Sequence, residues 1–431
     1  MPAGCAGARS GCTAAAQARS TGRYATGLGR LFSQPNFAVE LIMKRRMFLK
    51  QGAALTSLSF AAFAPAWGQG QSGKPRLLVV LLRGGMDGLT AVPPVGDAQY
   101  NTIRPQIAIQ KSLRLNADFG LHPQLEGMHS LWQAGQLAVV HSTGFQYTGR
   151  SHFEGQDIMQ TGVMKPYVST SGWIGRAMEQ AKVDSGVAIS IPMPLILRGH
   201  DRATTQFPNW MPALRDQDLA AVANMWANDP MLNAYSEVIR EANLGKSLNS
   251  MNGVSFQNAR SMQGLARSAA AAMRLESGPQ VGLIDMTHGF DTHASQGAEQ
   301  GNHADRLRDL DQLMTTFRDE MGGQWDNTLV LTITEFGRTA AENGTNGTDH
   351  GVGSCCFLAG GLVTQAKVYA DWRGLQKSAL FEERDLPATI DVTAVYAKVL
   401  ERVFALSPKT LANAGVLEHK TSPLLNGLLG V

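Results

Sequence analysis

Four uninterrupted apolar segments constrain the fold of this chain most strongly. They span residues 76–82 (RLLVVLL), 136–142 (QLAVVHS), 281–286 (VGLIDM) and 328–334 (TLVLTIT). A strand with one face in water would instead alternate between apolar and polar residues. Each segment is therefore predicted to be a strand buried on both faces, in a mostly parallel sheet covered by helices. With the helical segments between them, they predict an α/β doubly wound fold.

Two helical segments complete this prediction. Residues 303–321 carry an apolar stripe at helical spacing and end at Gly322 and Gly323, so we expect a helix that packs on the sheet. Residues 216–278 are rich in Ala, Met and Asn and contain no strand pattern. This stretch is predicted to be a helical insertion or a cap on the sheet.

Residues 43–66 have the pattern of an export signal. The basic start MKRRMFLK precedes a short apolar stretch that ends in the cleavage pattern APA. The pair Arg45 and Arg46 resembles the twin-arginine consensus, and the apolar stretch falls short of the roughly 20 residues that span a membrane. We expect the twin-arginine translocase to export the protein to the periplasm or beyond. The mature part, 67–431, is expected to have no stable membrane span.

Residues 1–42 precede this signal and are rich in Ala, Gly, Ser and Arg. A transit peptide has a similar composition, but the simpler account is that translation starts at Met43. We expect this extension to be absent from the mature protein. The export route is used by proteins that fold before crossing the membrane, often around a cofactor, which favours a metal.

Composition bounds the remaining alternatives. The 431 residues are 44% hydrophobic and 17% charged, with a formal net charge of +3. The chain can therefore bury a sizeable core, and it gives no reason to expect a nucleic-acid partner. Cys355 and Cys356 are adjacent in an apolar run, so on a strand their side chains point to opposite faces and cannot bridge. Both are expected to be small core residues.

Polar residues of metal-binding or catalytic type follow each apolar segment, where ligands bind in an open α/β sheet. The successive motifs are RGGMDG, TGRSHFE, HGFDTH and EFGRT, and DHG follows in a later loop. Carboxylates mixed with imidazoles are typical ligands of zinc, manganese or iron, whereas oxygen alone favours calcium or magnesium. The convergence of these motifs at strand ends predicts a metal site.

Two of these residues also have ordinary structural explanations. Asp87 could be a turn residue in the sequence Met-Asp-Gly. Ser151 could be the N-cap of the next helix, with Glu154 completing a capping box. A hydroxyl at a helix N-terminus is, however, also where an anionic substrate binds and a nucleophile is activated.

The arginines allow two interpretations as well. Arg338 could form an ion pair with Glu335, or it could clamp the oxygens of a phosphate or sulfate group beside a metal. Arg83 and Arg150 allow the same two roles. The sequence alone leaves both open.

The segments LLRGGMDGL, GRSHFEGQD, GFDTHASQ, TEFGRT and GTDHG occur in this order across nearly the whole mature chain. Together they resemble a bacterial family of twin-arginine-exported proteins, the domain of unknown function 1501. That family is similar in layout to the alkaline phosphatase and sulfatase superfamily. The resemblance implies a first-strand Asp, a hydroxyl or thiol nucleophile at a helix start, and Asp and His ligands for two metals.

Carried over to this sequence, the resemblance makes Asp87 the first-strand ligand and Ser151 the nucleophile. It assigns one metal to Asp291, His293 and His350, with Asp349 beside them. Glu335 stands where the superfamily has an Asp followed by a His, but Phe336 follows here, so one expected ligand is missing. His152 is the candidate for the missing imidazole.

These residues predict an exported metallohydrolase with one or two divalent ions that acts on a phosphate or sulfate ester, either a small molecule or a polymer. Arg338 would stabilise the transferred group, with Arg83 and Arg150 as further candidates. The alternative is a non-catalytic exported protein that keeps the metal as a folding element or for binding a surface polymer, and the altered Glu335-Phe336 pair favours it. A redox enzyme has no support, because residues 82–88 lack the spaced glycines of a dinucleotide site.

Overall fold

The computed structural model describes the following residues: 73–190, 192–206, 261–287 and 289–431. The predicted extension (1–42) and export signal (43–66) lie outside these residues, and so does most of the predicted insertion at 216–278. None of the described helices is long and apolar enough to cross a membrane.

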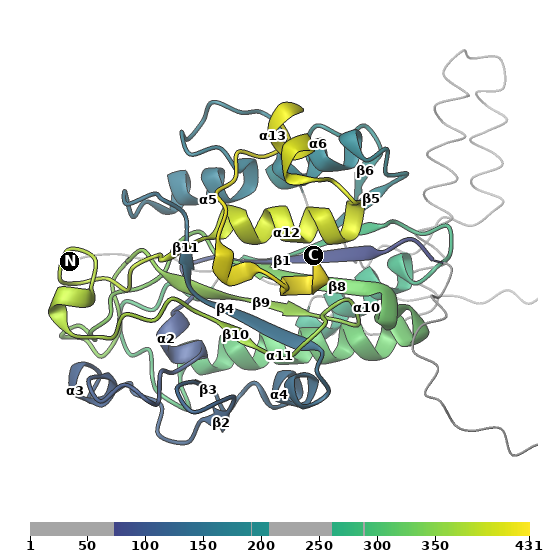
Figure 1. The fold of residues 1–431 in the computed structure, drawn as a ribbon. Coiled ribbons are helices and arrows are strands. Elements are labelled where there is room, and N and C mark those ends of the chain that lie inside the picture. The colour runs from purple at the N-terminus through teal and green to yellow at the C-terminus, as the bar shows by residue number, and fades with distance from the viewer. Residues whose placement is uncertain (1–72, 191, 207–260, 288) are drawn as a thin grey trace, which may run out of the picture. The chain divides into compact units, whose positions relative to one another are not determined.

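A nine-stranded sheet forms the centre of the fold, in the order β10-β4-β9-β8-β1-β7-β5-β6, with β11 also paired to β4 (Figure 1). Its strands are β1 (Arg76–Leu82), β4 (Leu137–Gly144), β5 (Gly186–Ile189), β6 (Ala203–Thr205), β7 (Val281–Met286), β8 (Thr328–Ile333), β9 (Ser354–Ala359), β10 (Val368–Tyr369) and β11 (Ile390–Asp391). Among these pairings, β9 is antiparallel to β4 and β8, and the others are parallel. The mostly parallel sheet is confirmed, and the four predicted segments are β1, β4, β7 and β8.

Strand β1 illustrates why the sheet must be covered on both faces. All 7 of its residues are buried. Leu77, Val79 and Leu81 pack into one hydrophobic cluster, while the leucines and valine between them pack into another. Each fully buried side chain of this size stabilises the fold by about 1.5–3 kcal/mol, so exposure of either face would be costly. Cys355 and Cys356 on β9 are free and buried in these two opposite clusters, as predicted.

Helices cover both faces of the sheet, which confirms the doubly wound arrangement (Figure 1). One face carries α5 (His152–Thr161), α6 (Trp173–Gln180), α12 (Val392–Phe404) and α13 (Pro408–Asn413). The other carries α4 (Glu126–Gln133), α10 (Met262–Met273) and α11 (Asn302–Met321). Helix α11 is the predicted helix, capped at Gly322. Helix α10 lies inside the range predicted as an insertion, and it packs on α11 and β7 as part of the helical layer.

A smaller substructure lies between β1 and α4. It contains the short helices α2 (Gly88–Ala91) and α3 (Tyr100–Ile103) and the antiparallel pair β2 (Leu113–Arg114) and β3 (Gly120–Leu121). Among its buried side chains, Leu115 and Phe119 belong to the cluster on the α4 face of the sheet, whereas Leu89 and Tyr100 belong to a third, smaller cluster.

The loops after β8 and before β9 are locked together at the carboxyl edge of the sheet. Arg338 and His350 form an isolated antiparallel bridge. The Gly337 amide donates to the Val352 carbonyl at 3.0 Å, and the Gly351 amide donates back to the Gly337 carbonyl at 2.9 Å. The predicted site residues of the fourth motif and of the DHG motif therefore lie side by side.

Substitution of Gly337 tests this contact. A Cβ atom there would lie 1.6 Å from the Gly353 carbonyl oxygen, so the two loops would have to separate. We expect Gly337→Ala to lower the melting temperature by about 5 °C or more. Gly344→Ala, whose Cβ would meet nothing within 4 Å, should leave it unchanged. Equal melting temperatures for the two variants in scanning calorimetry would contradict the tight contact.

Candidate metal centre

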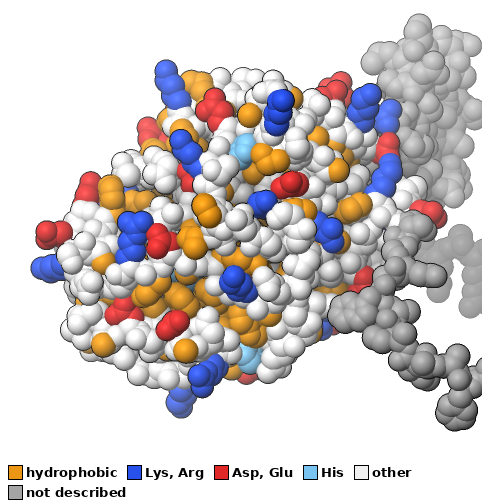
Figure 2. Space-filling view, in the orientation of Figure 1, with side chains coloured by type: hydrophobic (Ala, Val, Ile, Leu, Met, Phe, Trp, Pro, Cys, Tyr) orange, Lys and Arg blue, Asp and Glu red, His pale blue; other side chains and the backbone are white. Residues whose placement is uncertain are grey.

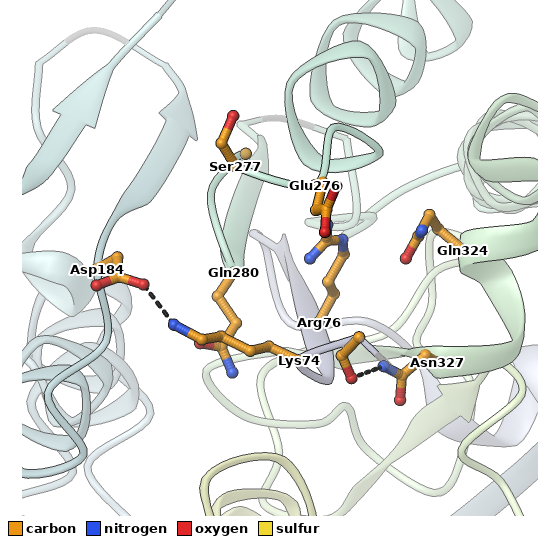
Figure 3. A pocket seen from close by; sticks show the side chains of 10 residues that line it. Lys74, Arg76, Asp184, Glu276, Ser277, Gln280, Gln324 and Asn327 are labelled. Atoms are coloured by element: carbon orange, nitrogen blue, oxygen red, sulfur yellow. Dashed lines mark hydrogen bonds and ion pairs between the residues drawn. The ribbon is translucent and has the colours of Figure 1, made fainter. Parts of the chain in front are cut away.

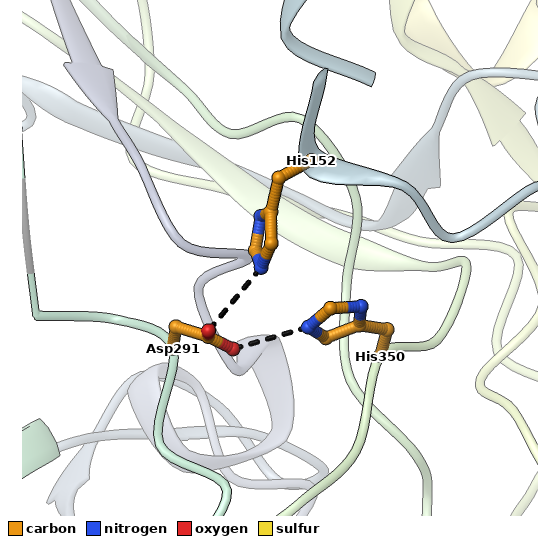
Figure 4. Close-up of side chains that lie close together, drawn as sticks. All are labelled: His152, Asp291 and His350. Atoms are coloured by element: carbon orange, nitrogen blue, oxygen red, sulfur yellow. Dashed lines mark hydrogen bonds and ion pairs between the residues drawn. The ribbon is translucent and has the colours of Figure 1, made fainter. Parts of the chain in front are cut away.

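Three imidazoles converge on the carboxylate of Asp291, beyond the end of β7. The Nε2 atoms of His293 and His350 lie 3.0 and 3.1 Å from Asp291 Oδ1, and His152 Nε2 lies 3.3 Å from Oδ2. Figure 4 shows His152 and His350 both pointing at this carboxylate. His152, Asp291 and His350 each offer a ligand atom within 4.8 Å of the others. Residues from the motifs HGFDTH, TGRSHFE and DHG thus meet at one point.

The other ring nitrogen of each histidine is held from outside the cluster. His152 Nδ1 donates to Glu335 at 2.9 Å, His293 Nδ1 donates to Asp349 at 3.0 Å, and His350 Nδ1 donates to the Arg150 carbonyl at 2.8 Å. These acceptors carry no proton to give, so each Nδ1 must carry the hydrogen. In the neutral rings, Nε2 then presents a lone pair to the centre. Outer partners of this kind fix the tautomer of metal-binding histidines.

The inward nitrogens need a positive charge between them. His293 Nε2 and His350 Nε2 lie 3.0 Å apart, and two lone pairs at that distance repel unless a proton or a cation lies between them. His152 Nε2 is buried and has no hydrogen-bond partner among the described residues. Three imidazoles with one carboxylate match the ligands of zinc, manganese or iron. The residues present therefore fit a divalent metal.

Arg338 holds the Asp291 carboxylate in place. Its guanidinium is fully buried and donates to Asp291 Oδ1 at 2.8 Å, to the Thr348 hydroxyl at 3.2 Å and to the Thr348 carbonyl at 2.8 Å. Burial opposes ionisation of Asp291, but Arg338 outweighs it and holds the pKa of this carboxyl below its usual range. The predicted ion pair with Glu335 is not formed. Each nitrogen of the Arg338 guanidinium already donates to the protein, so its predicted direct role on a transferred group would use the remaining N–H donors or need a rearrangement.

Glu335 lies behind His152 rather than at the centre. It is fully buried and accepts hydrogen bonds from His152, from the Gly84 amide at 2.8 Å and from Gln156 at 3.1 Å. Burial would raise the pKa of Glu335, but the hydrogen bond from His152 and the other donors lower it overall. The same bond raises the pKa of His152. In this arrangement Glu335 orients a ligand, and His152 is the imidazole that reaches the centre.

Asp87 makes its contacts outside the candidate metal centre, contrary to its predicted role as a metal ligand. It caps α2 and forms a fully buried ion pair with Arg104 at 2.6 Å. It also accepts from Thr90 and Gln296, both at 2.7 Å. Burial opposes its ionisation, but Arg104 holds the pKa of Asp87 well below its usual range. The carboxylate is thus held by the protein itself. Its place at the start of α2 agrees with the turn role that the sequence left open, whereas the ion pair with Arg104 was not anticipated.

The two other arginines are also engaged in ion pairs. Arg83 forms a bidentate pair with Asp285 at 2.8 Å. The Arg150 side chain pairs with Asp385 at 2.7 Å and with Glu382 at 2.5 Å, while its carbonyl holds His350. Both arginines therefore support the surrounding structure.

Ser151 occupies the N-cap position of α5, directly before His152. Its hydroxyl makes no capping hydrogen bond, and Glu154 accepts from the Tyr147 hydroxyl instead. The capping box that the sequence allowed is therefore not formed. The hydroxyl is not consumed by the helix backbone.

Four residues that the sequence did not single out complete the surroundings: Arg104, Gln156, Gln296 and Thr348. Gln156 lies four residues after His152 on α5, so helical spacing could have placed it on the same face. Thr348 directly precedes Asp349 in the GTDHG motif. Gln296 is the last residue of the GFDTHASQ segment, whereas Arg104 lies in a loop that no local pattern marks. Gln296 links the Asp87 pair to Thr348, whose hydroxyl donates to it at 2.7 Å.

Substitution of Arg104 separates a structural role of Asp87 from a metal-binding one. Arg104→Met leaves a buried carboxylate without its partner and should lower the free energy of unfolding by about 3–5 kcal/mol, measured by urea denaturation. Metal bound per folded molecule should not change in Arg104→Met or in Asp87→Asn. Loss of metal from folded Asp87→Asn would instead restore Asp87 as a ligand.

The chain matches a known protein family over most of its length. The family model described as "Protein of unknown function (DUF1501)" matches residues 74–414. The chain belongs to this family. Comparison of this DUF1501 protein with the curated proteins gave no match.

Solved structures similar to this DUF1501 protein are distant. One is the C-terminal periplasmic domain of EcEptC from Escherichia coli in complex with zinc (10% identity, 66% of this chain and 72% of that chain, TM-score 0.30). Another is the PsFucS1 sulfatase from Pseudoalteromonas sp. (14% identity, 77% and 68% covered, TM-score 0.37). A third is an alkaline phosphatase superfamily protein from Vibrio parahaemolyticus (14% identity, 67% and 61% covered, TM-score 0.32). Likenesses of this size say nothing about the chemistry of the site.

Proposed function

We propose that this protein is an exported metal-dependent hydrolase that acts on a phosphate or sulfate ester. The observation that carries the proposal is the convergence of three imidazole Nε2 atoms on Asp291, with every Nδ1 held from outside. His152, Asp291, His293 and His350 would hold a zinc, manganese or iron ion. When bound, such an ion supplies Lewis-acid charge that polarises an ester oxygen and stabilises developing negative charge.

The surrounding residues would orient these ligands. Glu335 and Asp349 fix the ring planes of His152 and His293, and Arg338 fixes the Asp291 carboxylate. We propose a single ion, because Asp87 is saturated by Arg104. Arg338 then acts as a positioning residue, in place of the direct role that the sequence suggested for it.

Ser151 is the proposed nucleophile. It lies at the start of α5, where the helix N-terminus favours negative charge, and next to the ligand His152. Its hydroxyl does not cap the helix and hydrogen-bonds the Tyr147 hydroxyl instead. The proposal also rests on the resemblance of this segment to the nucleophile position of the alkaline phosphatase and sulfatase superfamily.

Export by the twin-arginine translocase to the periplasm or the cell surface is part of this proposal. It rests on the pattern of residues 43–66, which lie outside the described residues. The substrate would then be a small-molecule or polymer ester met outside the cytoplasm. A protein that folds around its metal before export suits this route.

One observation favours the alternative, a non-catalytic metal-binding protein with a structural or polymer-binding role. Arg83, Arg150 and Arg338 are all engaged with protein carboxylates. Most N–H donors of these guanidiniums are therefore engaged by the protein and not by the phosphate or sulfate group of a substrate. Metal content alone does not separate the two functions, whereas turnover does.

Metal content tests the centre itself. The protein purified after export should contain about one equivalent of zinc, manganese or iron by elemental mass spectrometry. His350→Ala should lose this metal while remaining folded, because one of the inward nitrogens is removed. His129→Ala, a substitution of a half-buried histidine on α4 outside the centre, is the control and should keep it. A folded wild-type protein without stoichiometric metal would rule out the proposed centre.

Turnover tests the hydrolase. The metal-loaded protein should hydrolyse aryl phosphate or aryl sulfate esters, and Ser151→Ala should reduce turnover to background with metal content unchanged. Ser130→Ala, on the surface of α4, should keep full activity. Undiminished turnover in Ser151→Ala would remove this residue from the mechanism. Absence of turnover in the metal-loaded wild type would leave the non-catalytic alternative.

A further inference from the structure

A cavity of about 460 Å³ lies at the amino-terminal edge of the sheet, opposite the candidate metal centre (Figure 3). Its walls come from the residues that precede or begin four parallel strands. Lys74 and Arg76 belong to the start of β1, Asp184 precedes β5, Gln280 precedes β7 and Asn327 precedes β8. Because these strands run in one direction, the cavity and the metal centre lie at opposite ends of the sheet. The two sites share no residue.

Arg76 lines this cavity and carries a buried positive charge without a counter-ion. The residue is only 4% exposed, yet it forms no ion pair among the described residues. One guanidinium NH2 donates to the Leu275 carbonyl at 2.7 Å, and Nε has no hydrogen-bond partner. A buried charge without a partner is costly unless an anion or further hydrogen bonds compensate it. Burial accordingly lowers the pKa of Arg76.

The other groups that line the cavity are polar. Gln280, Gln324 and Asn327 present amides that both donate and accept hydrogen bonds. Lys74 pairs with Asp184 at the exposed rim, at 2.5 Å. Glu276 also lines the cavity but is not within ion-pair distance of Arg76. The volume is in the range of small-molecule sites, which span about 300–1,000 Å³.

We infer that this cavity is a binding site for a small hydroxylated anion, such as an acidic or phosphorylated sugar, whose anionic group pairs with Arg76. A carboxylate, sulfate or phosphate would satisfy the guanidinium atoms that the protein leaves open, since arginine binds such groups through paired N–H donors. The amides then bind hydroxyl groups of the same molecule. This site is independent of the proposed hydrolase activity.

Calorimetric titration with four probes tests this inference: sulfate, phosphate, glucuronate and glucose 6-phosphate. The wild-type protein should bind at least one of the sugar-borne anions, and Arg76→Met should weaken that binding by about tenfold or more, because a charge-assisted hydrogen bond is lost. Lys74→Met, a substitution at the exposed rim that the fold tolerates, should weaken it by a smaller factor. Binding of the inorganic anions alone would show an anion site without the sugar contacts and would overturn the ligand class.

Two controls separate the cavity from the other sites. Binding that survives in Arg76→Met and disappears in His350→Ala belongs to the metal centre and overturns the inference. Arg76→Met should melt no lower than the wild type without ligand, and only the wild type should be stabilised by the anion. Glu276→Gln should bind the anion at least as tightly as the wild type. A lower melting temperature of Glu276→Gln without ligand would instead identify Glu276 as the partner of Arg76 and overturn the inference.

Discussion

Burial of both faces of the central strands is the constraint on which the rest of this structure depends. Strand β1 sends alternate side chains into two separate cores, so helices must cover the sheet on each side. Polar side chains can then reach solvent only beyond the strand ends. The parallel direction of β1, β4, β7 and β8 brings four carboxyl ends to one edge. The candidate metal ligands collect there because the interior of the sheet has no place for them.

At that edge, a buried polar network holds the loops in position. Arg338 ties Asp291 to Thr348, Gln296 ties Thr348 to Asp87, and Arg104 neutralises Asp87. Each group in this chain is satisfied by its neighbour, which removes the cost of burying charge in a low-dielectric interior. Three imidazoles sit at the exposed end of the network, each with one nitrogen held outward. The rigid outer partners leave the inward nitrogens preorganised for a cation.

Much of the fold follows from sequence pattern, whereas the short strands do not. The unbroken apolar run of 76–82 and the stripe of 303–321 mark their elements clearly. Burial on both faces leaves a strand without polar positions, and burial along one stripe imposes a helical period. Strands β5, β6, β10 and β11 have at most 4 residues each, too few to show a period. The antiparallel strand β9 was not predicted either, although its two adjacent free cysteines were placed correctly on opposite faces. Its direction depends on its partners β4 and β8, which local sequence does not encode.

For the candidate site, the sequence by itself determined which side chains stand at the strand ends. Asp291, His293, His350 and Asp349 belong to short loop motifs, and the strand order that brings such loops together follows from the parallel sheet. Only the tertiary structure decided the partners. Asp87 pairs with Arg104, Arg338 supports Asp291 rather than Glu335, and His152 reaches the centre in place of Glu335. These choices depend on burial and on which donor faces which acceptor, and both are fixed by contacts between segments far apart in the chain.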